Sequence, residues 1–217
     1  MPYKTVLTGG RGEIEEKKSR FIATVRPVST ENEALDIIAA IRKEFWDARH
    51  NCYAYTIGSR GELQRCSDDG EPGGTAGRPI LSVLSGEEIR NCIIVVTRYF
   101  GGTLLGTGGL VRAYQSAAKE GLAHCTVIER QEGQRLTVCT DYSGVGKLQF
   151  LMATQNTAVL DSRYTDTVEI DVILPVAKVS RFTEAVTEAT GAKARILTGR
   201  KAEFAATDDG ILIFDEK

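Results

Sequence analysis

The segment RYFGGTLLGTGGLVRAY, residues 98–114, has the composition of an anion-binding loop. It follows the apolar run CIIVV and leads into a segment with helical spacing, and it contains no acidic residue. A loop that passes from a strand end into a helix start gathers free backbone N–H groups at the positive end of the helix dipole. Because glycines let an anion approach this backbone closely, we predict a nucleic-acid or phosphate-binding loop made of Gly101, Gly102, Gly106, Thr107, Gly108 and Gly109, flanked by Arg98 and Arg112.

Two known phosphate-binding patterns do not match this loop. The P-loop requires a Lys that the sequence lacks after Gly108 and Gly109. The dinucleotide fingerprint fails as well, since Val111 stands where its third glycine would be. A purely structural role, in which the glycines serve tight turns and close helix packing, therefore stays open beside the binding role.

The acidic stretch SDDGEP places Asp68, Asp69 and Glu71 within four residues. Three neighbouring carboxylates suit a hard cation such as magnesium, and Asp-Asp-Gly is also a common turn sequence. We expect this loop to position Arg98 or Arg49 across a cleft, with magnesium as the metal it would suit. No other cofactor is expected.

The segment DARHNCYAY raises the question of a nucleophile. His50 and Cys52 are two residues apart and share one face of a predicted strand, so a Cys–His pair is conceivable. No sequence context activates the thiol, and a packing role is the expected one. The sequence also lacks HExxH, GxSxG and zinc-spaced Cys/His motifs. With no catalytic motif, we favour a binding protein over an enzyme.

Composition and net charge limit where the protein can bind an anion and in which cellular compartment it is expected. The 217 residues carry a net charge of −2, so any anion binding must be local. The stretch from Ile89 to Lys119 holds only basic charges, and it contains the glycine loop. Five cysteines without a CxxC motif predict reduced thiols in a cytoplasmic protein. The apolar runs are too short to span a bilayer, so no membrane association is expected.

Periodicity predicts an α+β protein of two domains, residues 1–131 and 132–217. In the first, Thr30 and Glu33 form a capping box before a helix, the stretch SDDGEPGGTAGRP is a loop, and CIIVVTRYF is a strand buried on both faces. A second unit begins near RQEGQ and shows the order β-α-β-β-α-β of a ferredoxin-like split motif.

Four blocks of the chain closely resemble the signature blocks of the IMPACT family, in its bacterial YigZ type. They are KKSRFI, DARHNCYAYTIG, SDDGEPGGTAGRPIL and VVTRYFGGTLLGTGGLVRAYQSA, in this order between Lys17 and Gly121. The resemblance implies a first domain like the second domain of ribosomal protein S-five. It also implies a second domain like the ferredoxin-like domains of elongation factor G.

The resemblance also implies a link to translation. Eukaryotic relatives regulate translation by competing for a ribosome-associated activator of the amino-acid-starvation kinase. That partner is not carried over, because we expect the extra N-terminal interaction domain of those relatives to be missing before the matching blocks. We therefore expect RNA or the ribosome as partner, a role in regulation of translation, and no protein partner that the sequence identifies.

A rival prediction comes from the same loop. Small-molecule kinases of the galactokinase and homoserine-kinase class share the first domain's implied fold, and LLGTGGLVRA is similar to their phosphate loop. Their serines are missing here, and Thr107 offers the one hydroxyl of that segment. The alternative function is thus an enzyme or binder acting on a phosphorylated small molecule or nucleotide.

The predicted binding surface combines these residues. Arg98, Arg112 and the amides of residues 101–109 bind phosphates, while Tyr99 stacks on a base. Asp68, Asp69 and Glu71 position the arginines or a metal, and His50 completes the surface. On this view, Arg98→Glu abolishes RNA binding without unfolding the protein.

Overall fold

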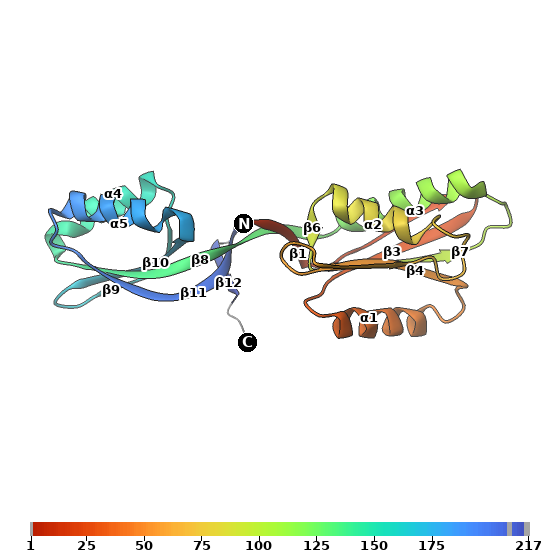
Figure 1. Cartoon of the computed structure of the whole chain (residues 1–217), viewed down its shortest axis with the longest axis horizontal. Helices are drawn as coiled ribbons and strands as arrows, with labels where there is room; N and C mark the ends of the chain where they lie inside the picture. Colours follow the sequence, from red (N-terminus) through yellow and green to blue (C-terminus); the bar gives the residue numbers. More distant parts are fainter. Residues whose placement is uncertain (1, 208–209, 215–217) are drawn as a thin grey trace. The chain divides into compact units, whose positions relative to one another are not determined.

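The structure is a computed structural model that describes residues 2–207 and 210–214. The chain forms two compact units, one from Tyr3 to Ile128 and one from Glu129 onward, as the predicted two-domain α+β fold requires (Figure 1). The predicted boundary between residues 131 and 132 falls inside strand β8 (Thr126–Thr140). The segment RQEGQ, near which the second unit was predicted to begin, is part of this strand.

The first unit is built on an antiparallel sheet of five strands in the order β2-β3-β7-β4-β5. The strands are β2 (Arg11–Glu16), β3 (Ser19–Pro27), β4 (His50–Ile57), β5 (Leu63–Ser67) and β7 (Cys92–Tyr99). Two further short strands, β1 (Tyr3–Thr8) and β6 (Ile89–Arg90), pair in parallel.

Helices cover both faces of this sheet (Figure 1). Helix α1 (Glu31–Glu44) lies on one face, and α2 (Gly77–Gly86) and α3 (Gly106–Ala123) lie on the other. The predicted capping box is confirmed, because the Thr30 hydroxyl accepts from the Glu33 amide at 3.2 Å and the Glu33 carboxylate accepts from the Thr30 amide at 3.4 Å. This box fixes the start of α1 just before its apolar face begins.

Strand β7 lies in the centre of the sheet and is buried on both faces, as its unbroken apolar run predicted. Ile94 and Val96 pack with α2 and α3, while Ile93 and Val95 pack with α1. Since successive side chains of a strand point to opposite faces, the end of β7 directs Arg98 toward α2 and α3 and Tyr99 toward α1.

Helix α2 corrects the predicted loop, which was expected to run through Pro79. The helix starts at Gly77 and buries Ile80, Val83 and Leu84. Proline is tolerated in the first turn of a helix, where its missing N–H costs no hydrogen bond. Gly77 is needed for close packing, because a Cβ there would lie 2.8 Å from the Ser67 backbone. The dense Gly and Pro pattern thus marked a helix start as well as a loop.

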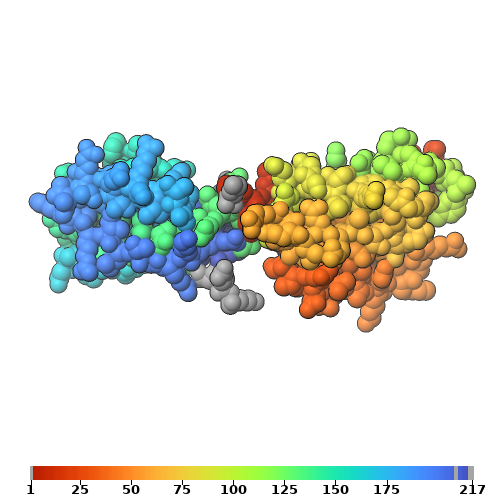
Figure 2. Space-filling model, in the orientation of Figure 1, coloured from red at the N-terminus to blue at the C-terminus, as the bar shows by residue number. Residues whose placement is uncertain are grey.

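The second unit confirms the order β-α-β-β-α-β. Its sheet is antiparallel with the order β9-β10-β8-β11-β12, so β8 and β10 are flanked on both sides. Helices α4 and α5 lie on one face of it (Figure 1), and Figure 2 shows the same unit as a space-filling surface. Leu148, Met152, Phe182 and Val186 of these helices pack with the strands in one core. The elements after β8 are α4 (Tyr142–Thr154), β9 (Ala158–Tyr164), β10 (Val168–Pro175), a 3₁₀ turn (Val176–Lys178), α5 (Val179–Thr190), β11 (Arg195–Thr207) and β12 (Gly210–Phe214).

Candidate functional site

One end of the first unit's sheet gathers the residues that the sequence singled out. In the strand register Arg20 pairs with Tyr99, and His50 pairs with Arg98. The β2–β3 turn, the start of β4 and the glycine loop therefore meet at the same end. The acidic loop joins them, because His50 Nδ1 lies 2.9 Å from the Asp69 carbonyl oxygen. We call this region, formed by residues 17–19, 45–50, 68–76 and 98–112, the loop end.

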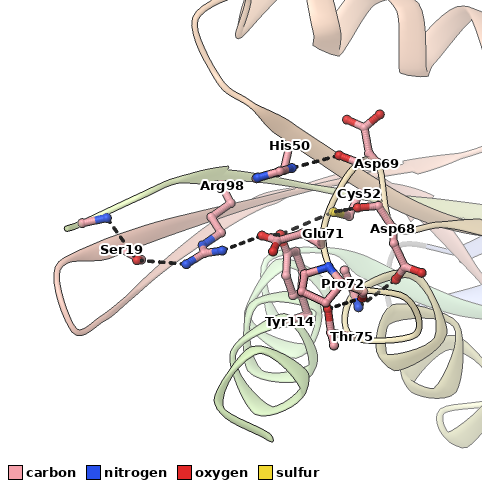
Figure 3. Close-up of polar contacts among 12 residues, drawn as sticks. Ser19, His50, Cys52, Asp68, Asp69, Glu71, Pro72, Thr75, Arg98 and Tyr114 are labelled. Carbon is pink, nitrogen blue, oxygen red and sulfur yellow. Dashed lines mark hydrogen bonds and ion pairs between the residues drawn. The ribbon is translucent and has the colours of Figure 1, made fainter. Parts of the chain in front are cut away.

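A buried ion pair lies at the centre of the loop end (Figure 3). Arg98 Nη1 donates to Glu71 Oε1 at 2.6 Å, and the two side chains are only 7% and 3% exposed. The Arg98 guanidinium also lies between two aromatic rings, 5.4 Å from the centroid of Phe21 and 5.6 Å from that of Phe100. Its charge is therefore compensated inside the protein, and Glu71 positions Arg98 by direct contact.

A hydrogen-bond chain extends this pair into helix α3. Tyr114 Oη donates to Glu71 Oε1 at 2.8 Å, and the Cys52 thiol lies 3.3 Å from Tyr114 Oη (Figure 3). Burial is the largest cause that raises the pKa of the Tyr114 hydroxyl, and the adjacent Cys52 and Glu71 raise this pKa further. The hydroxyl therefore stays a neutral hydrogen-bond donor. Burial also raises the pKa of Cys52 to about 12. A thiol that stays protonated at neutral pH makes a poor nucleophile, so this chain is built for positioning.

The carboxylate of Asp68 accepts hydrogen bonds at the start of helix α2. It accepts hydrogen bonds from the backbone N–H groups of Gly74, Ala76 and Gly77 at 2.8, 3.0 and 2.8 Å. Burial pushes the pKa of Asp68 upward, but these hydrogen bonds and the nearby Arg78 outweigh it and leave the pKa lowered. The protein thus places its own anion at the N-terminus of α2.

Asp69 has a third, separate set of partners. Its carboxylate accepts from Arg42 Nη2 at 2.5 Å and from the backbone N–H of Asn51 at 2.7 Å. The three carboxylates of the acidic loop therefore do not converge on one point. Within residues 2–207 and 210–214, no group of three or more His, Cys, Asp or Glu side chains is arranged to hold a metal ion.

The glycine loop passes over the β2–β3 turn before α3 begins. The Gly101 amide donates to Ser19 Oγ at 3.1 Å, and a Cβ on Gly101 would lie 2.0 Å from the Lys18 backbone, so only glycine fits. Gly106 opens α3 with a φ of 69°, and Gly102, Thr107 and Gly108 are exposed while Gly109 is half-buried. No described side chain caps this helix, and its first turn holds no acid. Its first amides are therefore open to solvent.

Arg112 lies against this first turn. It is exposed, and its Nη1 is 3.7 Å from the position of a Cβ on Gly108. In the described part of the chain it makes no ion pair. Of the two arginines that flank the glycines, Arg112 is thus the one whose charge faces solvent.

Tyr99 lies apart from the other predicted residues, because it points to the α1 face. Its hydroxyl donates to Asp47 Oδ1 at 2.7 Å, and the Arg20 guanidinium lies 5.8 Å from its ring centroid. The aromatic residue beside the loop is Phe100, which is 53% exposed and which sequence reasoning missed. Strand alternation carried the signal, since residues 98 and 100 share a face. Lys17 and Lys18, exposed in the β2–β3 turn, were missed as well.

Comparison with known proteins shows which family has this architecture. Residues 17–122 match the Impact N-terminal domain, and residues 139–193 match a domain of unknown function, DUF1949. The chain is 41% identical over 197 residues to IMPACT family member YvyE of Bacillus subtilis (strain 168), covering 91% of both proteins. It is 37% identical over 170 residues to IMPACT family member YigZ of Escherichia coli (strain K12), covering 77% of this chain and 83% of that protein.

A solved structure agrees with these relatives. It is described as the crystal structure of an hypothetical protein, and it matches with a TM-score of 0.59 at 31% identity, over 92% of this chain and 98% of that one. The fold and the loop end define a two-domain α+β protein with a glycine-rich loop above a buried Arg–Glu pair. The chain belongs to the IMPACT family, in its bacterial YigZ type. None of its described helices is long and apolar enough to cross a membrane.

The buried ion pair generates a stability prediction. Arg98→Met leaves the Glu71 carboxylate buried without its partner, and we expect the free energy of unfolding to fall by about 3–5 kcal/mol. The double variant Arg98→Met/Glu71→Gln should lose clearly less than the sum of the two single variants. Urea denaturation followed by circular dichroism measures all three. Arg42→Met, which removes the half-exposed pair with Asp69, is the control and should cost about 0–1 kcal/mol. Additive single effects would contradict a coupled pair.

Asp68 generates a pH prediction. Its pKa is lowered in the folded state, so its stabilising effect is complete above the ordinary Asp value of 3.8 and disappears as the pH falls through the lower folded value. We expect Asp68→Asn to lower the free energy of unfolding by about 1–2 kcal/mol at pH 7 and by much less near pH 3. Urea denaturation at both pH values measures this difference. Asp36→Asn, on the exposed side of α1, is the control. A deficit that stays constant with pH would contradict the role of the Asp68 charge.

Proposed function

We propose that this protein binds RNA through the loop end and acts on the translation machinery. The observation that carries the proposal is the acid-free and uncapped start of α3, with Arg112 and Phe100 exposed beside it. Amides, a cation and an aromatic ring are the three groups that proteins use for phosphates and unstacked bases.

The phosphate contacts come from the backbone of α3. The starts of α1, α2 and α4 are occupied by side chains of this chain, from Thr30, Asp68 and Asp141 respectively. The 18-residue α3 has no such group among the described residues, so its first amides are left for an external anion. Arg112, Lys17 and Lys18 add positive charge, and none of them forms an ion pair with an acid of the described residues. A chain with a net charge of −2 needs such a local site.

The base contact comes from Phe100. Its ring is held by the Arg98 guanidinium, which the buried Glu71 carboxylate fixes in turn. A ring that is held in place yet half-exposed offers a stacking surface at little entropic cost. Leu104, which is 83% exposed in the same loop, extends the apolar surface. Stacking of this kind favours unpaired bases, so single-stranded RNA or a ribosomal RNA loop is the expected target.

The buried position of Arg98 changes which variant tests the proposal. Arg98→Glu would place a second carboxylate against Glu71 inside the domain, so that variant is expected to unfold it. Loss of binding in Arg98→Glu would therefore not identify a binding residue. Exchange of Arg112 or Phe100 keeps both partners of the buried ion pair, and Phe100→Ser removes one of the two rings beside Arg98.

We expect Arg112→Gln to weaken binding to single-stranded RNA and to reduce the salt dependence of the affinity by about one released counterion. Phe100→Ser should weaken binding by about 1–3 kcal/mol and leave the salt dependence unchanged. Fluorescence anisotropy with a labelled single-stranded RNA at several salt concentrations measures both. Cosedimentation with ribosomal subunits at low and moderate salt shows whether the target is on the ribosome.

The controls lie on the other side of the sheet. Lys43→Gln removes an exposed charge of α1, and Leu35→Ser removes an apolar side chain of α1 that is 50% exposed. Both should bind RNA as the unchanged protein does. If the controls lose binding while Phe100→Ser and Arg112→Gln keep it, the binding surface lies on the α1 side and the proposed site is wrong. Absence of RNA and ribosome binding at every salt concentration would reject the function.

The alternative is a phosphorylated small molecule or nucleotide bound by the same amides. A ligand that binds only the folded state raises the melting temperature, so a panel of nucleotides with magnesium tests this alternative directly. A thermal shift that Arg112→Gln removes, in the absence of RNA binding, would favour the alternative over RNA.

A further inference from the structure

The second unit contains a pocket of about 360 Å³ at one end of its sheet. Strand β10 ends at Pro175, which pairs with Gly133 of β8, whereas β8 and β11 stay paired as far as Gln131 and Phe204. Because the pairing of β10 ends before that of β8 and β11, the sheet has a gap beside these two strands, and the pocket lies there. The segment of residues 155–157, between α4 and β9, closes one side of it. A volume of this size suits a small metabolite.

The floor of the pocket is apolar and well packed. Ile173, Leu174 and Phe204 line it, and all three are buried. Gly133 allows this packing, because a Cβ there would lie 2.6 Å from the Phe204 ring and 2.8 Å from the Ile173 side chain. A ligand that fits must therefore carry an apolar body.

The rim of the pocket is polar. The side chains of Gln131, Gln155, Asn156, Thr157 and Lys178 line it, and none of them bonds to another described residue. Carboxamides and a hydroxyl both donate and accept, so they can serve a polar group of a ligand. No Asp or Glu of the described chain lines the pocket, and Lys178 is its charged group. The lining therefore selects for a negative charge.

Helix α5 adds to this preference. A 3₁₀ turn (Val176–Lys178) runs directly into it, the Val179 N–H donates to the Val176 carbonyl oxygen, and neither this turn nor the first turn of α5 holds an acid. The positive end of the helix dipole and the ammonium group thus favour an anion at the same rim. One lysine matches a singly charged carboxylate better than a phosphate dianion, which is normally held by more than one cation.

We propose that this pocket is a binding site for a small organic carboxylate with an apolar body. The proposal concerns the second unit and is independent of the RNA-binding surface. The apolar body lies on Ile173 and Phe204, and the carboxylate lies at Lys178 and the start of α5.

The test uses the full chain, labelled with ¹⁵N, and benzoate as the probe in an NMR titration. Benzamide and benzylamine keep the ring but replace the carboxylate by a neutral and a cationic group. We expect benzoate to shift the amide signals of Asn156, Thr157, Lys178 and Ala206 in a saturable manner, with Kd on the order of 0.1–1 mM. Benzamide should bind more weakly, and benzylamine should leave these signals unchanged.

Two variants and a control locate the site. Lys178→Gln should weaken benzoate binding about fivefold or more while leaving benzamide binding unchanged. Ala206→Leu fills the pocket from an exposed position and should abolish binding of both. Arg181→Gln, an exposed α5 residue outside the pocket, is the control for charge on this helix. Non-saturable shifts, shifts spread outside the pocket, or equal binding of benzoate and benzylamine would overturn the proposal.

Discussion

The loop end of the first unit depends on the buried pair of Arg98 and Glu71. Through it, strand β7, the acidic loop and helix α3 are joined in one network, since Glu71 also accepts from Tyr114. Arg98 Nη2 and the Gly101 amide both approach Ser19 Oγ, at 3.5 and 3.1 Å, which adds the β2–β3 turn. Burying two charges costs solvation free energy that their attraction only partly offsets. What the pair provides here is a single arrangement of β7, α3, the acidic loop and the β2–β3 turn, with Phe100 held at the surface.

Helix starts are of two kinds in this protein, and both proposed binding sites lie at the second kind. Three helices are capped by the protein's own side chains, among them α2, where Asp68 accepts three backbone amides. Helices α3 and α5 are left without such a cap in the described residues, and in each case a basic residue lies at the open end, Arg112 or Lys178. An anion from outside can take the place of the missing cap at either helix. The two proposed binding sites thus share one physical principle, the attraction of a negative charge to the positive end of a helix beside a basic side chain.

Particular residues show why part of the site could be predicted and part could not. The glycine loop was recognisable because a run of glycines between an apolar strand and a helical pattern leaves the backbone open to close approach. The role of Arg98 could not be recognised in the same way, because a formal charge gives no information on burial. Its partner Glu71 also lies 27 residues away along the chain. Tyr99 was chosen on chemical type and Phe100 was not considered, although strand alternation already separated Tyr99 from Arg98. Helix α2 was missed because its first turn consists of residues that normally break helices.

By itself, the sequence determined the two α+β units, the capping box of α1, the central position of β7 and the family to which the chain belongs. These features depend on local periodicity and on residue types at short spacing, which act within a single element. Only the tertiary structure decided which charges face solvent. It buried Arg98 against Glu71, exposed Arg112, turned Tyr99 to the α1 face and opened a pocket where β10 ends before β8 and β11. Burial and charge pairing arise between elements that are distant along the chain, so they appear only once the sheet has set their neighbours.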